Sequence, residues 1–168
     1  GNVDLAAYLA KYNTGLTVRD VANQIASPDV KGLFDTSILG EQAIPEPVYR
    51  EAVQKHRPKL QQLFADIFAK HKLDALVFPA TPLPAQPIEN SMEVMLNGKM
   101  LPTFFTFISN TDPGSNAGVP GLSVLMGLTA DGLPVGVALE GPAGSDRRLL
   151  AIGLALEHVL PPMTRPKR

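Results

Sequence analysis

The sequence predicts an α/β fold, and three observations lead to that prediction. Residues 1–72 carry apolar side chains at helical spacing, whereas residues 73–168 hold short apolar runs typical of strands, a hairpin and a closing helix. Prolines and glycines gather between residues 79 and 142, where they mark turns around a sheet. We therefore expect a single α/β domain over residues 1–168, with a mixed β-sheet flanked by helices.

The first region has start signals for several helices. Residues 4–12 place their apolar side chains on one face. Thr17 and Asp20 form a capping-box-like pair that begins a helix over residues 18–26. A Ser-Pro pair then predicts a short helix over residues 28–35.

The longest helical pattern covers residues 49–71, where apolar side chains recur every three or four residues. Pro58 lies inside this pattern. Because proline lacks an N–H and clashes with the preceding turn, we expect a kink or two abutting helices there.

The second region supplies the strands. Residues 74–79 form a continuous apolar run that ends in proline, as in a strand buried on both faces. Residues 121–129 and 134–140 are rich in β-formers and are joined by Ala-Asp-Gly, a strong hairpin signal. Ser145 precedes a wide apolar stripe over residues 146–160, which predicts a capped helix. The strand count is low, which indicates that part of the sheet lies outside this chain.

Composition and charge exclude several functional classes. The chain is 45% hydrophobic and 18% charged, with 15 basic and 16 acidic residues, as in a folded globular protein. No basic block indicates binding to nucleic acid, and no apolar run is long enough to span a membrane. The chain has no cysteine, which excludes disulfides and thiolate catalysis. We expect a cytoplasmic protein.

The most distinctive segment is the glycine-rich stretch 110–121, which we expect to be a loop. It does not match a phosphate-binding loop, because no lysine follows its glycines and a strand comes next. Ser115 lacks the Gly-x-Ser-x-Gly context of a serine nucleophile. The glycines are therefore expected to serve tight turns, with Asn116 bonding to local backbone.

The other polar groups specify no chemistry by themselves. His158 is expected late on the closing helix, where a cation is favourable. His56 and His71 are far apart, and no metal-ligand spacing occurs. Glu140, at the end of a strand, could face a cleft, but one carboxylate alone defines no reaction. We expect no metal and no cofactor.

Four segments, taken together, resemble the amidase-signature family. Residues 73–82 resemble its hydrophobic strand and Pro-x-x-Pro segment, and residues 116–124 resemble its Asn-x-x-Gly-x-Pro loop and following strand. Residues 131–142 are similar to its closing hairpin, and residues 149–157 to its last helix. The segments keep the family's order and spacing over roughly residues 50–160. The resemblance implies the C-terminal portion of the amidase-signature fold, most like the mandelamide and indoleacetamide hydrolase branch.

Members of this family hydrolyse amides with a Ser-cisSer-Lys triad, in which the lysine is the base. The resemblance implies that a parent enzyme converts a small carboxamide to an acid and ammonia. Its triad lies in the N-terminal half, and this chain has no Gly-Gly-Ser-Ser run. We therefore expect no catalytic residue here, an N-terminal catalytic half as partner, and no activity of the chain alone. The absence of an initiating Met agrees with a fragment.

The resemblance also implies that this chain forms one wall of the substrate pocket. The candidate substrate-binding residues are Thr81, Phe105, Ile108, Asn110 and Asn116. Phe105 and Ile108 would line an aryl-acyl pocket, and Asn110 would orient the carboxamide. For each candidate, core packing or loop capping is the alternative.

Two other functions stay open. The chain could be a non-catalytic binding or assembly module, because an unpaired sheet edge invites formation of a homo-oligomer. It could also be part of an amidotransferase subunit that passes ammonia to a partner. The absence of a basic surface for tRNA favours a simple hydrolase.

Overall fold

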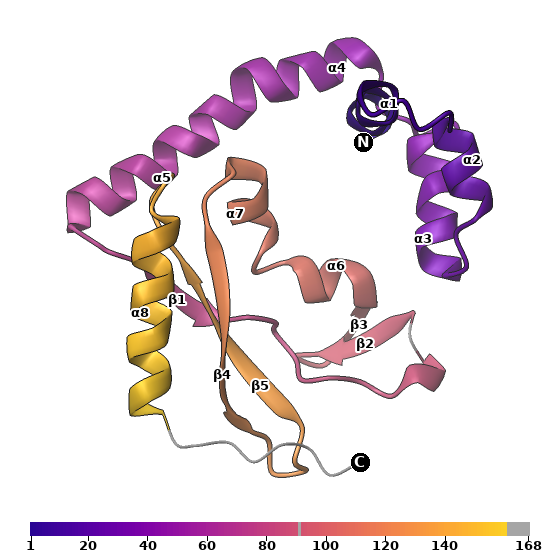
Figure 1. The fold of residues 1–168 in the computed structure, drawn as a ribbon. Helices are drawn as coiled ribbons and strands as arrows, with labels where there is room; N and C mark the ends of the chain where they lie inside the picture. The colour runs from indigo at the N-terminus through magenta and orange to yellow at the C-terminus, as the bar shows by residue number, and fades with distance from the viewer. Residues whose placement is uncertain (91, 161–168) are drawn as a thin grey trace. The chain divides into compact units, whose positions relative to one another are not determined.

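The computed structural model describes residues 1–90 and 92–160 and divides the chain into two compact units, Gly1–His56 and Arg57–Arg168. Helices and strands are both present, so the predicted α/β class is confirmed. Figure 1 shows the elements of each unit. No helix in the described residues is long and apolar enough to cross a bilayer. That the chain is one domain stays a prediction.

The first unit consists of short helices joined by turns. Its α-helices are α1 (Asn2–Lys11), α2 (Val18–Asn23), α3 (Pro28–Leu33) and α4 (Glu46–Glu51). Two π-helices, η1 (Phe34–Ile38) and η2 (Ala52–His56), follow α3 and α4. Leu9 of α1 packs into a small core with Val18 and Ala22 of α2, and all three side chains are buried.

The capping box predicted at the start of α2 is confirmed. The backbone N–H of Asp20 donates to Thr17 Oγ1 at 3.2 Å, and the backbone N–H of Thr17 donates to Asp20 Oδ2 at 2.8 Å. Each bond satisfies a backbone donor that has no partner within the helix. Helix α2 ends at Asn23, earlier than the predicted end at residue 26.

The helix around Pro58 is irregular, as predicted, but it is not divided into two separate helices. Residues 46–71 are helical without a gap, and α4 passes through the π-helix η2 into α5 (Arg57–His71). The π-helical turn lies directly before Pro58, where a regular α-helix would need the N–H that proline lacks.

The second unit is built on a three-stranded sheet with the order β1-β5-β4, in which both strand pairs are antiparallel. Its strands are β1 (Leu76–Pro79), β4 (Gly121–Leu128) and β5 (Pro134–Glu140). The predicted hairpin between β4 and β5 is confirmed. Its turn is closed by Thr129 N–H, which donates to Leu133 O at 2.8 Å, and Gly132 takes a φ of 82° that favours glycine.

The helix predicted after the sheet is α8 (Asp146–Val159), which covers one face of the sheet (Figure 1). The buried core between them consists of Val124, Val137, Leu139 and Leu149. A Cβ on Gly153 would lie 2.3 Å from Leu122 Cδ2, so this glycine allows α8 to approach β4 closely. Ser145 occupies the N-cap position, but its hydroxyl makes no capping hydrogen bond, contrary to prediction.

Strand β1 is not buried on both faces, and that prediction is wrong. Its residues alternate between half-buried and exposed, and Val77 is 63% exposed. Within the described sheet β1 is an edge strand next to β5, while α8 packs on β4 and β5. A continuous apolar run indicates burial only where other elements cover both faces of the strand.

The stretch 110–121 is not a continuous loop, because it contains helix α7 (Asp112–Ala117). Proline is favourable in the first helical turn, and Asp112 is favourable near the positive end of the helix dipole. Gly118 ends the helix with a φ of 74°, and its N–H donates to Gly114 O at 2.9 Å. The glycine that predicted a tight turn therefore terminates a helix.

A hairpin that we did not predict lies before this helix. Strands β2 (Glu93–Leu96) and β3 (Lys99–Pro102) pair antiparallel, and Asn97 and Gly98 join them with φ values of 51° and 78°. Asn-Gly is a strong signal for a two-residue hairpin, so the sequence carried this information. A short 3₁₀ turn, η3 (Ile88–Asn90), precedes β2, and helix α6 (Thr103–Ile108) follows β3.

Candidate functional site

The predicted substrate-binding residues lie on four parts of the second unit. Thr81 follows β1, Phe105 and Ile108 belong to α6, Asn110 lies in the turn after α6, and Asn116 belongs to α7. One long-range hydrogen bond joins two of these parts. Asn110 Nδ2 donates to Pro79 O at 2.9 Å, which attaches the α6–α7 turn to the end of β1.

The Asn110 side chain has one polar atom without a hydrogen bond in the described residues. Its amide N–H groups face the carbonyl of Pro79, whereas the described residues supply no donor for its Oδ1. A carboxamide oxygen accepts hydrogen bonds, and an amide substrate offers N–H donors. Asn110 is therefore suited to accept a hydrogen bond from a carboxamide, with its orientation set by the bond to β1.

Helix α6 presents an apolar side to solvent. Phe105 is 60% exposed, and its ring makes an edge-on contact with Phe104 at a centroid distance of 5.4 Å. Ile108 lies three residues further along the helix and therefore on the same side. Thr106 is buried and donates its hydroxyl to Pro102 O at 2.9 Å, which holds α6 against β3. An exposed aromatic pair of this kind is typical of a binding surface.

Thr81 and Asn116 make local contacts. Thr81 Oγ1 donates to Leu83 O at 2.7 Å within the proline-rich loop, and Thr81 also lines a cavity of about 460 Å³ beside β5. Asn116 Nδ2 donates to Asp112 O at 3.0 Å, one turn back on α7. The prediction that Asn116 bonds to local backbone is confirmed. Asn110 therefore lies beside the end of β1, close to Thr81 in the chain, whereas Asn116 forms its hydrogen bond within α7.

Glu140 is the polar group that the sequence analysis left without a role. It is the last residue of β5 and is only 7% exposed. Its side chain lines a cavity of about 310 Å³ together with Thr111 and Ser115 of the α7 region and Ser123 of β4. Burial raises the pKa of the Glu140 carboxyl above its usual range. The prediction that Glu140 could face a cleft is confirmed.

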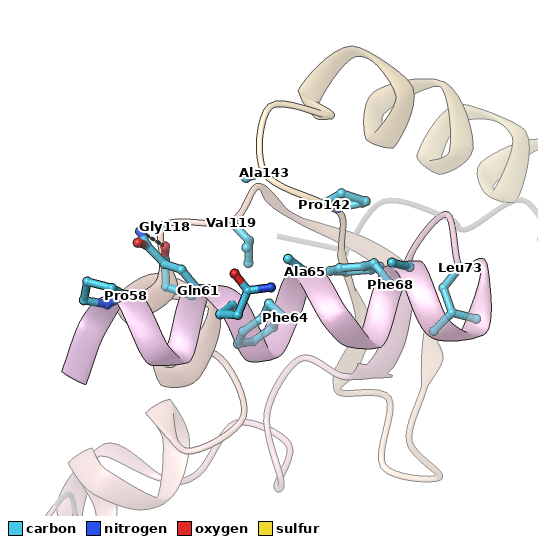
Figure 2. Close-up of a pocket in the computed structure, with 13 residues that line it drawn as sticks. Pro58, Gln61, Phe64, Ala65, Phe68, Leu73, Gly118, Val119, Pro142 and Ala143 are labelled. Atoms are coloured by element: carbon cyan, nitrogen blue, oxygen red, sulfur yellow. Dashed lines mark hydrogen bonds between the residues drawn. The ribbon is translucent and has the colours of Figure 1, made fainter. Parts of the chain in front are cut away.

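A cavity with a mainly apolar lining lies along α5 and has a volume of about 810 Å³ (Figure 2). Phe64 and Phe68 of α5 line it opposite Val119 and Pro142. Gln61 Nε2 donates to Ala117 O at 2.9 Å, which ties α5 to the end of α7. No titratable side chain lines this cavity, so it offers packing space and no reactive group.

The described residues contain no cluster of three or more His, Cys, Asp or Glu side chains that could hold a metal ion. Ser115 is exposed and has no hydrogen bond to a lysine or histidine among them. His158 lies in the last turn of α8, as predicted, and is exposed. The described part of the second unit therefore combines exposed polar and apolar side chains with one largely buried carboxyl.

The Amidase family model matches residues 3–150. The α/β chain therefore belongs to the amidase family, and the resemblance found in its sequence is confirmed. Within the family, it is 45% identical over 156 residues to the indoleacetamide hydrolase of Agrobacterium vitis, an alignment that covers 93% of this chain and 33% of that relative.

Two further comparisons agree with this assignment. The chain is 38% identical over 168 aligned residues to the mandelamide hydrolase of Pseudomonas putida, which covers 93% of this chain and 31% of that protein. A crystal structure of an amidase matches with a TM-score of 0.67 and 32% identity, over 91% of this chain and 31% of that one. The chain spans about a third of the length of the curated relatives that it matches.

Proposed function

We propose that this chain is the C-terminal region of an amidohydrolase that converts a small aryl carboxamide to its acid and ammonia. The observation that carries the proposal is the 45% identity to an indoleacetamide hydrolase over 93% of this chain. This chain would correspond to about one third of the enzyme. The Ser-cisSer-Lys triad would lie in the other two thirds. The chain alone would then hydrolyse no amide.

In this proposal the second unit supplies one wall of the acyl pocket. The exposed side of α6 contacts the aryl group through Phe105 and Ile108, because burial of an aromatic ring against apolar side chains is favourable. Asn110 Oδ1 accepts a hydrogen bond from the carboxamide N–H, and Thr81 borders the same strand end. Asn116 acts by holding α7 in place through its bond to Asp112.

A chimaeric enzyme tests this function. The matching third of the Agrobacterium vitis indoleacetamide hydrolase is replaced by this chain, and release of ammonia from indoleacetamide is measured. We expect turnover by the chimaera and none by the purified 168-residue chain. Turnover by the chain alone, or a folded monodisperse chimaera without turnover, would contradict the proposal.

A further inference from the structure

The position of Glu140 in the sheet determines where its carboxylate points. Glu140 is paired with Leu76 on one side and with Gly121 on the other, so it lies in the central strand. Successive side chains of a strand point to opposite faces. Because Leu139 packs into the core beneath α8, Glu140 points to the opposite face, where α7 lies.

Helix α7 covers this carboxylate at a glycine. A Cβ on Gly114 would lie 1.9 Å from Glu140 Oε1 and 2.8 Å from Oε2. Any side chain at position 114 would therefore occupy the place of the carboxylate. Gly114 is itself buried, so the glycine allows the acidic group to be enclosed between helix and sheet.

The cavity beside Glu140 is rich in hydrogen-bond acceptors. The residues with polar side chains that line it are Glu140, Thr111, Ser115 and Ser123. The Thr111 hydroxyl donates to Ile108 O at 3.3 Å and keeps its lone pairs free. In the described part of the chain, the Glu140 carboxylate and the hydroxyls of Ser115 and Ser123 make no hydrogen bond.

A carboxylate that is largely shielded from water and has no partner is unfavourable, because no charge or donor replaces the hydration it has lost. Its surroundings supply no such charge, because no lysine, arginine or histidine of residues 1–90 and 92–160 forms an ion pair with Glu140. The cavity is therefore complementary to a group that brings positive charge and several N–H donors.

We propose that this cavity binds a primary ammonium group, R–NH₃⁺, through the Glu140 carboxylate and the hydroxyls of Thr111, Ser115 and Ser123. An anion would be repelled by the carboxylate. A calcium ion needs six to eight oxygen ligands with several carboxylates, which one carboxylate and three hydroxyls do not supply. The volume of about 310 Å³ exceeds that of one water-sized ion, which leaves space for an aliphatic stem on the nitrogen.

Two sources offer this chemistry. One is a free amine or ammonium ion from solution, and the other is a lysine side chain from the part of the longer amidase that has no counterpart in this chain. The proposal does not depend on amide hydrolysis, so its test uses binding and cross-linking, with no measurement of turnover.

The first arm uses the 168-residue chain with ¹³C-labelled glutamate carboxyl groups, followed by NMR at neutral pH. Methylammonium chloride is the probe, with sodium chloride and tetramethylammonium chloride at equal ionic strength as controls, because neither control cation has an N–H. We expect the Glu140 resonance to shift saturably with methylammonium alone. Ser123→Ala is expected to weaken binding about threefold to tenfold, the effect of one hydrogen bond.

Two glutamine variants report whether the response comes from this cavity. Binding to these variants is followed by the backbone amide resonances of the cavity residues Thr111 and Gly114. Glu140→Gln should abolish their response to methylammonium, whereas Glu157→Gln, on the exposed side of α8, should leave it unchanged. Contacts between the amide protons of β5 and β4 confirm that the sheet is formed in each sample. If Glu140→Gln does not fold, the Ser123→Ala variant provides the test on its own.

The second arm uses the chimaera with the indoleacetamide hydrolase and a zero-length carbodiimide cross-linker. A Glu140–lysine amide bond, identified by mass spectrometry, assigns the ammonium group to the rest of the enzyme. If methylammonium binds to both the chain and the chimaera and no Glu140–lysine cross-link forms, the ammonium group comes from a free amine. The proposal is wrong if the Glu140 resonance of the folded chain does not respond and no such cross-link forms.

Discussion

Glu140 and Gly114 show how a single pair of residues defines a local environment. A carboxylate at the end of a central strand is enclosed because the helix above it has no side chain at the contact position. The same contact reduces the access of water to the carboxyl group, which raises its pKa. The charge of Glu140, its burial and the close approach of the α7 backbone at Gly114 therefore depend on one another. Each of them can be tested by substitution.

The stability of the chain should depend on the ionisation of Glu140. Because the folded-state pKa is raised, the folded state binds the proton more tightly than the unfolded state, so this contribution stabilises at low pH. This contribution to stability is lost as the pH rises through the pKa that Glu140 has in the folded state. We predict that Glu140→Gln is more stable than the wild type at neutral pH, and that the difference disappears below the unfolded-state pKa near about 4.3.

Urea denaturation between pH 4 and pH 8 measures this difference. The buffer must contain no ammonium or primary amine, because such a ligand would stabilise the wild type. Equal stabilities of the two proteins across the whole range would contradict the raised pKa. Glu157→Gln serves as the exposed control and is expected to show no such dependence.

The contact between Gly114 and Glu140 should appear as an interaction energy. Gly114→Ala gains about 0.5–1 kcal/mol in helix propensity but places a methyl group where the carboxylate lies, and overpacking of this kind costs about 1–3 kcal/mol. We predict net destabilisation in the wild type and stabilisation in a Glu140→Ala background. A double-mutant cycle measured by denaturation should give a coupling of about 0.5–3 kcal/mol. Additive effects would show that the two groups are not in contact.

The role proposed for Phe105 can be tested in the chimaera. Burial of a phenyl ring contributes about 1.5–3 kcal/mol, so Phe105→Ala should lower kcat/KM for an aryl amide by about tenfold to a hundredfold. Leu150→Ala is the matched control, since Leu150 is 61% exposed on α8 and Phe105 is 60% exposed on α6. If the two variants have the same kcat/KM, Phe105 does not line the substrate pocket.

Among the elements, α8 illustrates how one helix face is selected for burial. Leu149 is 3% exposed and belongs to the core against the sheet, whereas Leu154 on the same helix is 57% exposed. Both positions carry the same side chain in the same secondary structure. The difference between them therefore comes from packing alone.

This difference predicts unequal costs for the same substitution. Leu149→Ala should destabilise the chain by about 2–5 kcal/mol, because it removes buried methyl groups and leaves a cavity. Leu154→Ala should change stability by less than about 0.5 kcal/mol. Chemical denaturation of both variants checks the prediction, and similar costs would mean that α8 does not pack on the sheet by this face.

The elements also show which sequence signals were sufficient. The Thr17–Asp20 capping box and the β4–β5 hairpin depend on residues close together in the chain, and both formed as predicted. The Asn97-Gly98 turn is equally local, and its dipeptide is by itself a hairpin signal. The segment of α7 differs, because its proline and glycines are typical of turns as well as of helix ends, and only their spacing between Thr111 and Gly118 favours a helix.

For the molecule as a whole, the sheet of the second unit ends in two strands, β1 and β4, that have a neighbour on one side only in the described residues. Unpaired strand edges form hydrogen bonds with other strands, and β4 exposes Leu125 and Met126. This chain matches about a third of the length of its longer relatives. Their additional residues are available to pair with or shield such strand edges.

We predict that the isolated chain self-associates through β4. Sedimentation equilibrium should show an average mass that rises with concentration, and Leu125→Lys should reduce this rise because a charge on an edge strand opposes pairing. Leu150→Lys, on the exposed side of α8, is the matched control and should associate like the wild type. If the wild-type chain stays monomeric over the full concentration range, association through the edge of β4 is excluded.

The sequence by itself determined the α/β class, the Thr17–Asp20 capping box, the β4–β5 hairpin, the closing helix and the relationship to amidases, because these depend on neighbouring residues and on ordered motifs. Only the tertiary structure decided that β1 lies at an edge, that Asn110 is bonded to Pro79, and that Glu140 is enclosed beneath Gly114. The physical reason is that burial and desolvation arise from contacts between segments far apart in the chain. A strand end or a glycine shows its role only when its neighbour in space is known.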